Sequence, residues 1–264
     1  SCFVRNYEMI FITKILIKYE KISKNIDAIN RTLYNSFVAK IYHKGVRFMK
    51  KMRKIAILLA AAMLAAILGG CGSFDASGYI KALLDNSYKN DSTAFVEQKI
   101  GTQEQAKELY ESGIDTAMGS MTSQQQLSDE LNEEFEAVVK DVYKSVKYTV
   151  GEATKKDDGS YEVEIKYQKM KVFAPAMENF TTATESYVEE MTEKASNGED
   201  VPSEEEMNEA TYAMLKDAIK DSLGTITYED EATTTVRVEL VNKVYTPNEE
   251  DVYNLEQLLF DIEA

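Results

Sequence analysis

Apolar side chains recur every three or four residues over most of the chain beyond residue 77, which is the spacing of one face of an α-helix. Two helix starts carry a capping box, in which a hydroxyl residue precedes Gln or Glu by three positions: Thr102 with Gln105, and Ser203 with Glu206. The predicted helices cover residues 77–88, 91–95, 102–118, 122–146, 175–197, 203–224 and 247–262.

The apolar spacing changes from helical to alternating between these helices. Residues 148–150 and 161–167 alternate apolar and polar side chains, which predicts strands with one buried face. Asp158-Gly159 lies between them and is a strong signal for a tight hairpin turn, so we interpret Asp157 and Asp158 as turn residues. Residues 225–228 and 233–245 are predicted as two further strands.

The order of these elements predicts the fold class. A run of helices precedes each pair of strands, and this order favours an α+β fold over alternating β-α-β units. We therefore expect a single domain in which helices pack on one face of a roughly four-stranded antiparallel sheet. The two helix–hairpin halves lie roughly 78 residues apart, so an internal duplication is a hypothesis.

A short apolar run precedes this body. Residues 55–68 are apolar and follow the basic residues Lys50, Lys51, Arg53 and Lys54. The run is shorter than the roughly 20 residues that a bilayer-spanning helix needs. A basic start before a short apolar core is typical of a secretory signal. A membrane-spanning anchor that is never cut is the alternative.

The run ends in Leu68-Gly69-Gly70-Cys71, which resembles the lipobox of bacterial lipoproteins. The resemblance implies cleavage between Gly70 and Cys71 and a diacylglyceryl thioether on the Cys71 sulfur. It also implies anchoring at the outer face of the cytoplasmic membrane, because two or more acyl chains hold a protein firmly on a bilayer. The chain is similar in layout to small surface lipoproteins of clostridial-type Gram-positive bacteria.

These features divide the chain into four parts. A signal normally starts close to the true start codon, so we interpret residues 1–48 as a non-native extension translated upstream of Met49 or Met52. A genuine cytoplasmic extension is the alternative. Residues 49–70 are the predicted signal peptide, 71–77 a lipidated tether, and 78–264 the extracytoplasmic α+β domain.

Charge limits the partners of the mature chain. The first 70 residues contain 13 of the 30 basic residues but only 3 of the 45 acidic ones, which leaves 17 basic and 42 acidic residues among the remaining 194. The resulting net charge of −25 argues against nucleic-acid binding, which needs a cationic surface. It also argues against a body that lies flat on anionic lipid.

Histidine and cysteine are missing from the predicted mature body. His43 and Cys2 lie in the upstream extension, and Cys71 is the predicted lipid site. We therefore predict no catalytic residues, no cofactor, no disulfide and no zinc site. The acidic segment with Glu199, Asp200 and Glu204 is interpreted as a solvated loop, with a calcium site as the alternative.

Tyrosines on the predicted strands are the one candidate for a ligand pocket. Tyr148, Tyr161 and Tyr167 occupy apolar strand positions, where they either pack in the core or line an amphipathic pocket. We expect a binding or interaction module whose partners are the membrane, through Cys71, and an envelope protein or small ligand. The alternatives are a carboxylate-dependent cell-wall glycan hydrolase and a small solute-binding lipoprotein of a transporter.

Overall fold

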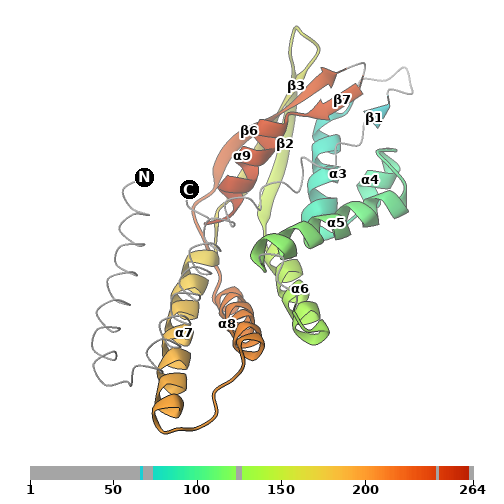
Figure 1. Cartoon of the computed structure of the whole chain (residues 1–264). Coiled ribbons are helices and arrows are strands. Elements are labelled where there is room, and N and C mark those ends of the chain that lie inside the picture. Colours follow the sequence, from blue (N-terminus) through green and yellow to red (C-terminus); the bar gives the residue numbers. More distant parts are fainter. Residues whose placement is uncertain (1–65, 68–73, 123–126, 242–243, 262–264) are drawn as a thin grey trace.

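The computed structural model describes residues 66–67, 74–122, 127–241 and 244–261 (Figure 1). Its strands are β1 (Ala66–Ile67), β2 (Lys147–Lys155), β3 (Tyr161–Gln168), β4 (Met170–Lys171), β5 (Thr227–Tyr228), β6 (Ala232–Val241) and β7 (Val244–Pro247). Its helices are α3 (Ala76–Lys89), α4 (Thr93–Glu97), α5 (Gln103–Met121), α6 (Asp129–Lys144), α7 (Phe173–Ser196), α8 (Glu204–Gly224) and α9 (Glu249–Leu259).

The main sheet is antiparallel throughout, with strand order β1-β7-β6-β3-β2. Four of its strands are substantial and β1 has two residues, so the predicted α+β fold with a roughly four-stranded antiparallel sheet is confirmed. The membership of the sheet differs in detail. The stretch predicted as one strand over 233–245 forms both β6 and β7, and β5 pairs with β4 in a separate two-stranded sheet.

The turn between β2 and β3 has the predicted Asp-Gly chemistry. Gly159 has φ of +86°, a conformation that glycine adopts without steric cost. Asp158 Oδ1 accepts hydrogen bonds from Ser160 N and Ser160 Oγ, at 2.9 and 2.6 Å. These bonds hold the pKa of the Asp158 carboxyl below its usual value. Asp158 is therefore a turn residue, as the sequence predicts.

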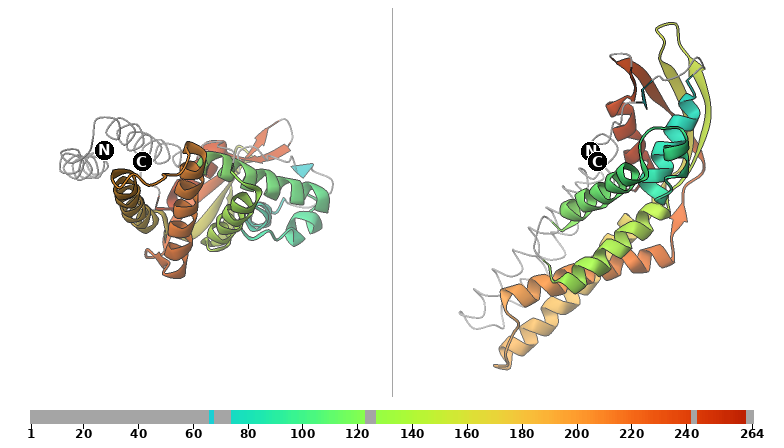
Figure 2. Two further views of the ribbon diagram at one scale, coloured as in Figure 1. Left: turned by 60° about the horizontal axis from the view of Figure 1, so that its bottom comes forward. Right: turned by 90° about the vertical axis from the view of Figure 1, so that its right-hand side faces the viewer.

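Helices cover one face of the sheet, and the strand register explains which face. Val163 of β3 lies opposite Val236 of β6, and Tyr161 lies opposite Val238, so all four side chains point to the same side. All four are buried, whereas Glu164, the residue after Val163, is exposed. Figure 2 shows α3 against this curved sheet. The sheet thus has one covered face and one wet face.

Helices α7 and α8 form an arm, which we define as residues 173–224. They run antiparallel and pack against each other, and α8 also packs on α6 (Figure 2, right). The arm leads away from the sheet and makes the molecule elongated. Helix α7 has 24 residues, which corresponds to a length of about 36 Å.

The root of the arm is fastened by a residue from the other end of the domain. Asp261 Oδ1 accepts hydrogen bonds from the backbone N–H groups of Val172 and Phe173, at 3.2 and 2.8 Å, and Oδ2 accepts one from Ala174 at 2.9 Å. The Asp261 N–H in turn donates to the Met170 carbonyl at 3.0 Å. Asp261 thereby satisfies three of the amides that the first turn of α7 leaves without intrahelical partners.

The predicted signal and lipid site fall largely outside the described residues. Residues 1–48, Leu68, Gly69, Gly70 and Cys71 are among those not described. Ala66 and Ile67, within the predicted signal peptide, form β1 and pair with β7. Cleavage before Cys71 would therefore remove β1 and leave β7 at the edge of the sheet. Among the helices of the described ranges, none combines the length and hydropathy needed to cross a bilayer.

Candidate functional site

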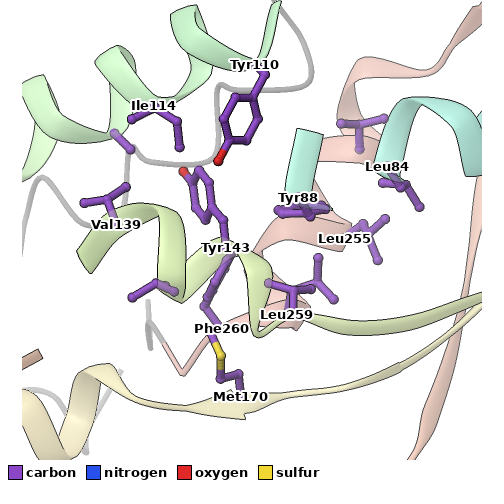
Figure 3. Packing of buried hydrophobic residues seen from close by; sticks show 14 of the residues in the cluster. Leu84, Tyr88, Tyr110, Ile114, Val139, Tyr143, Met170, Leu255, Leu259 and Phe260 are labelled. Carbon is purple, nitrogen blue, oxygen red and sulfur yellow. The ribbon is translucent and has the colours of Figure 1, made fainter. Parts of the chain in front are cut away.

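A buried polar cluster lies where α3, α6 and α9 meet, and Figure 3 shows its two tyrosines, Tyr88 and Tyr143. We define it as Tyr88, Tyr143 and Glu256, whose exposed fractions are 3%, 3% and 4%. Each helix brings one member because its polar residue occupies a position on the buried stripe of that helix. The cluster therefore places two phenols and one carboxylate inside the core.

The two phenol hydroxyls of this cluster make no hydrogen bond to any described residue. Tyr88 Oη and Tyr143 Oη are both fully shielded from solvent and both lack a partner. A buried polar group without a hydrogen bond costs on the order of 1–3 kcal/mol. Such groups stand out in native structures and point to places where water or a small polar molecule could bind.

Burial and charge both disfavour ionisation of these phenols. Burial raises the pKa of Tyr88 and of Tyr143 well above 10, and the negative charge of Glu256 raises both further. Both phenols therefore stay neutral over the physiological pH range. In that form each hydroxyl can donate one hydrogen bond and accept others.

Aromatic rings surround the polar cluster. The rings of Tyr88 and Tyr143 meet edge to face at 5.8 Å, and Phe260 lies 6.5 Å from the first and 6.1 Å from the second. Figure 3 shows Leu255 and Leu259 of α9 beside them. These apolar neighbours exclude water and keep the local dielectric low, which strengthens any hydrogen bond made inside.

The cluster does not have the composition of a glycan hydrolase site. Glycan hydrolysis uses two carboxylates that flank one bond. Within the described ranges, Glu256 is the one Asp or Glu that is buried. The same residues contain no group of three or more His, Cys, Asp or Glu side chains that could hold a metal ion, which leaves the calcium alternative without support.

The structure brings together two of the three tyrosines predicted to line a pocket. Tyr148 on β2 lies directly opposite Tyr167 on β3. Tyr161 is six residues earlier on β3 than Tyr167, a separation of about 20 Å at the rise of a strand. Tyr148 approaches the polar cluster, because its ring lies 6.0 Å from that of Tyr88. Its hydroxyl donates to Asp85 Oδ1 at 2.7 Å.

Tyr161 belongs instead to an aromatic clamp at the opposite end of the sheet, which we define as Phe74, Tyr79, Tyr161 and Tyr245. The Phe74 ring stacks on Tyr245 with centroids 4.0 Å apart and planes 13° from parallel. It also meets Tyr79 at 5.4 Å and Tyr161 at 5.7 Å. The clamp therefore fixes the chain at Phe74, just before α3 begins.

Sequence reasoning missed Glu256, although a signal for it exists. Val252, Leu255 and Leu259 form the apolar stripe of the last helix, and Glu256 occupies the i+4 position from Val252 on that stripe. A carboxylate at such a position predicts a buried charge. Tyr88 lies on the apolar stripe of the first helix, but nothing in the sequence shows that it meets Tyr143.

Comparisons with protein-family models, with curated protein sequences and with solved structures find no match to this chain. Interpretation of the site therefore rests on its own chemistry and geometry.

Proposed function

We propose that the protein is a lipoprotein anchored through Cys71 to the outer face of the cytoplasmic membrane, where its body serves as a binding or interaction module. The sequence of residues 49–71 supports the anchor, because a basic start, a short apolar core and a Cys after two glycines occur in that order. The partner is an envelope protein or a small ligand.

The observation that carries the proposal is the position of the aromatic clamp. Phe74 lies three residues after Cys71 and is held in the clamp at one end of the sheet. The arm extends from the other end of the body (Figure 1). A lipid on Cys71 would thus hold the molecule by one end and leave the arm available to other envelope components.

Replacing the lipidated sulfur tests the anchor. We expect Cys71→Ser to abolish incorporation of labelled palmitate, to block removal of the signal and to change membrane association, because only a thiol accepts the diacylglyceryl group. Ser73→Ala is the matched control, since Ser73 lies two residues after Cys71 and has no sulfur to accept the lipid. Normal processing of Cys71→Ser would contradict the proposal.

Recovery of a partner tests the interaction function. Chemical cross-linking of the anchored protein in its native membrane, followed by mass spectrometry, should yield one defined envelope protein. Native mass spectrometry of the same protein should instead reveal an added mass if it carries a small ligand. Failure of both measurements, in cells where Cys71 is lipidated, would remove the interaction function and leave the anchor standing.

A further inference from the structure

We propose that the sheet end of the anchored protein rests on the bilayer, with Leu240 and Val241 in contact with lipid and the arm pointing away from the membrane. The inference rests on the proposed lipidation of Cys71. It adds a defined orientation and a second membrane contact that the lipid anchor alone does not require.

A short tether joins the predicted lipid site to the folded body. Cys71 and Phe74 are three residues apart, and three residues span at most about 11 Å even when fully extended. Phe74 is fixed by its stack on Tyr245, and the helix that follows packs on the sheet. A lipid on Cys71 therefore keeps this end of the body close to the membrane surface.

Two exposed apolar side chains lie beside the tether. Leu240 lies opposite Tyr245 in the register of β6 and β7, and Val241 lies opposite Val244. Tyr245 is the residue on which Phe74 stacks, so Leu240 is one strand away from the anchored segment. Leu240 and Val241 are 43% and 48% exposed, and both are among the few large apolar side chains that are exposed in the described parts of the chain. They are consecutive on β6, so their side chains lie on opposite faces of the strand at its end.

The sheet end and the far end of the arm differ in charge. The turn of residues 155–158, which lies at the sheet end, has two lysines and two aspartates. At the far end of the arm, Glu199 and Asp200 precede the three consecutive glutamates of residues 204–206, and all five are exposed. Anionic lipid repels an acidic surface, so contact through the sheet end is favoured over contact through the arm.

The two ends are well separated in space. Figure 1 shows the hairpins β2–β3 and β6–β7 at the top of the molecule and the loop between α7 and α8 at the bottom. One end therefore combines the tether, two exposed apolar side chains and a turn with as many lysines as aspartates. The other end is acidic and lies far away. In the proposed orientation, the long axis of the molecule therefore stands perpendicular to the membrane, with the sheet end toward the lipid.

Depth measurement on the full lipidated protein tests this orientation. A single reporter cysteine, Val241→Cys or Val201→Cys, is labelled with an environment-sensitive fluorophore in vesicles of phosphatidylglycerol and phosphatidylethanolamine. Val201 is the matched control, because it is a valine of similar exposure (44%) in the loop at the far end of the arm. We expect a blue shift and several-fold stronger quenching by spin-labelled lipid at position 241 only.

The outcomes separate this inference from the proposed function. If the vesicles float with the protein but position 241 is quenched no more than position 201, the orientation is wrong and the anchor stands. Stronger quenching at position 201 overturns the orientation in the same way. If the protein does not float with the vesicles, both proposals fail. Both reporter sites are exposed, and circular dichroism of each variant checks that the fold is kept.

Discussion

Tyr143, inside the core, and Tyr228, at its edge, differ in whether their hydroxyl groups have a hydrogen-bond partner. Tyr143 Oη is buried without a hydrogen bond, whereas Tyr228 Oη donates to the Ser145 carbonyl at 2.7 Å. Removing an unpartnered buried hydroxyl relieves a desolvation cost, but removing a paired one leaves a carbonyl without its donor.

We therefore expect Tyr143→Phe to leave the free energy of unfolding unchanged or to raise it by up to about 1 kcal/mol, and Tyr228→Phe to lower it by about 1 kcal/mol. Urea unfolding of the two variants measures the difference. A marked loss of stability in Tyr143→Phe would indicate that the hydroxyl binds a partner, such as a bound ligand or an internal water.

Asp261 offers a second prediction for a single side chain. Its carboxylate caps three N–H groups at the start of α7, where the N-cap position itself is Val172 and supplies no capping side chain. We expect Asp261→Ala to lower the free energy of unfolding by about 1–2 kcal/mol. The exposed Asp115→Ala on α5 is the control and should change it far less.

At the scale of secondary structure, α7 stands out for the number of hydroxyl side chains that bond back to its own carbonyls. Thr182 Oγ1 donates to Glu178 O at 3.1 Å, and Ser186 Oγ donates to Thr182 O at 3.1 Å. Such hydroxyls slightly destabilise and often bend a helix. Both side chains are exposed, so they contribute little packing in return.

We expect the double variant Thr182→Ala/Ser186→Ala to stabilise the protein by about 1 kcal/mol and to raise its Tm by about 2–4 °C. Thr184→Ala is the contrast, because Thr184 is buried and its replacement removes packing. Thermal unfolding followed by circular dichroism compares the three proteins. A lower Tm in the double variant would show that these hydroxyls stabilise the arm.

Element types were readable from the sequence because they depend on local spacing. The capping boxes at Thr102 and Ser203 are both present in the structure with both of their hydrogen bonds. The turn between β6 and β7 was missed because residues 233–245 contain neither Gly nor Pro, the usual marks of a turn. Local spacing also cannot show that Asp261 caps a helix that starts 88 residues earlier.

Local spacing also did not show which residues meet at the candidate site. Sequence spacing placed Tyr148, Tyr161 and Tyr167 on one face of the sheet, and the strand register agrees with that placement. Whether side chains on one face meet depends on their positions along the strands and on the helices above them. The buried polar cluster depends on the packing of three helices, which no single stripe encodes.

For the whole molecule, buried tyrosines control how stability depends on pH. Burial raises the pKa of Tyr79 to about 12, and it raises the pKa values of Tyr88 and Tyr143 well above 10. In the unfolded chain these phenols have a pKa of about 10. Between these values the unfolded state loses protons that the folded state keeps, so folding stability is complete below pH about 10 and falls as pH rises further.

We expect each such tyrosine to lower the free energy of unfolding by about 1.4 kcal/mol per pH unit above pH 10. The double variant Tyr88→Phe/Tyr143→Phe should reduce this slope, whereas Tyr253→Phe, at an exposed position, should not. Urea unfolding at a series of alkaline pH values measures the slopes. Equal slopes in the wild-type protein and the double variant would show that the two phenols ionise normally in the folded state.

The cap that Asp261 provides also has a consequence for chains that lose their last residues. Asp261 lies 88 residues after Phe173, whose amide it holds. A chain that ends just before Asp261 keeps every residue of the sheet and of both arm helices but lacks the carboxylate that holds the first amides of α7. We expect such a chain to keep its helix content and to be cut more readily by proteases where the arm joins the sheet.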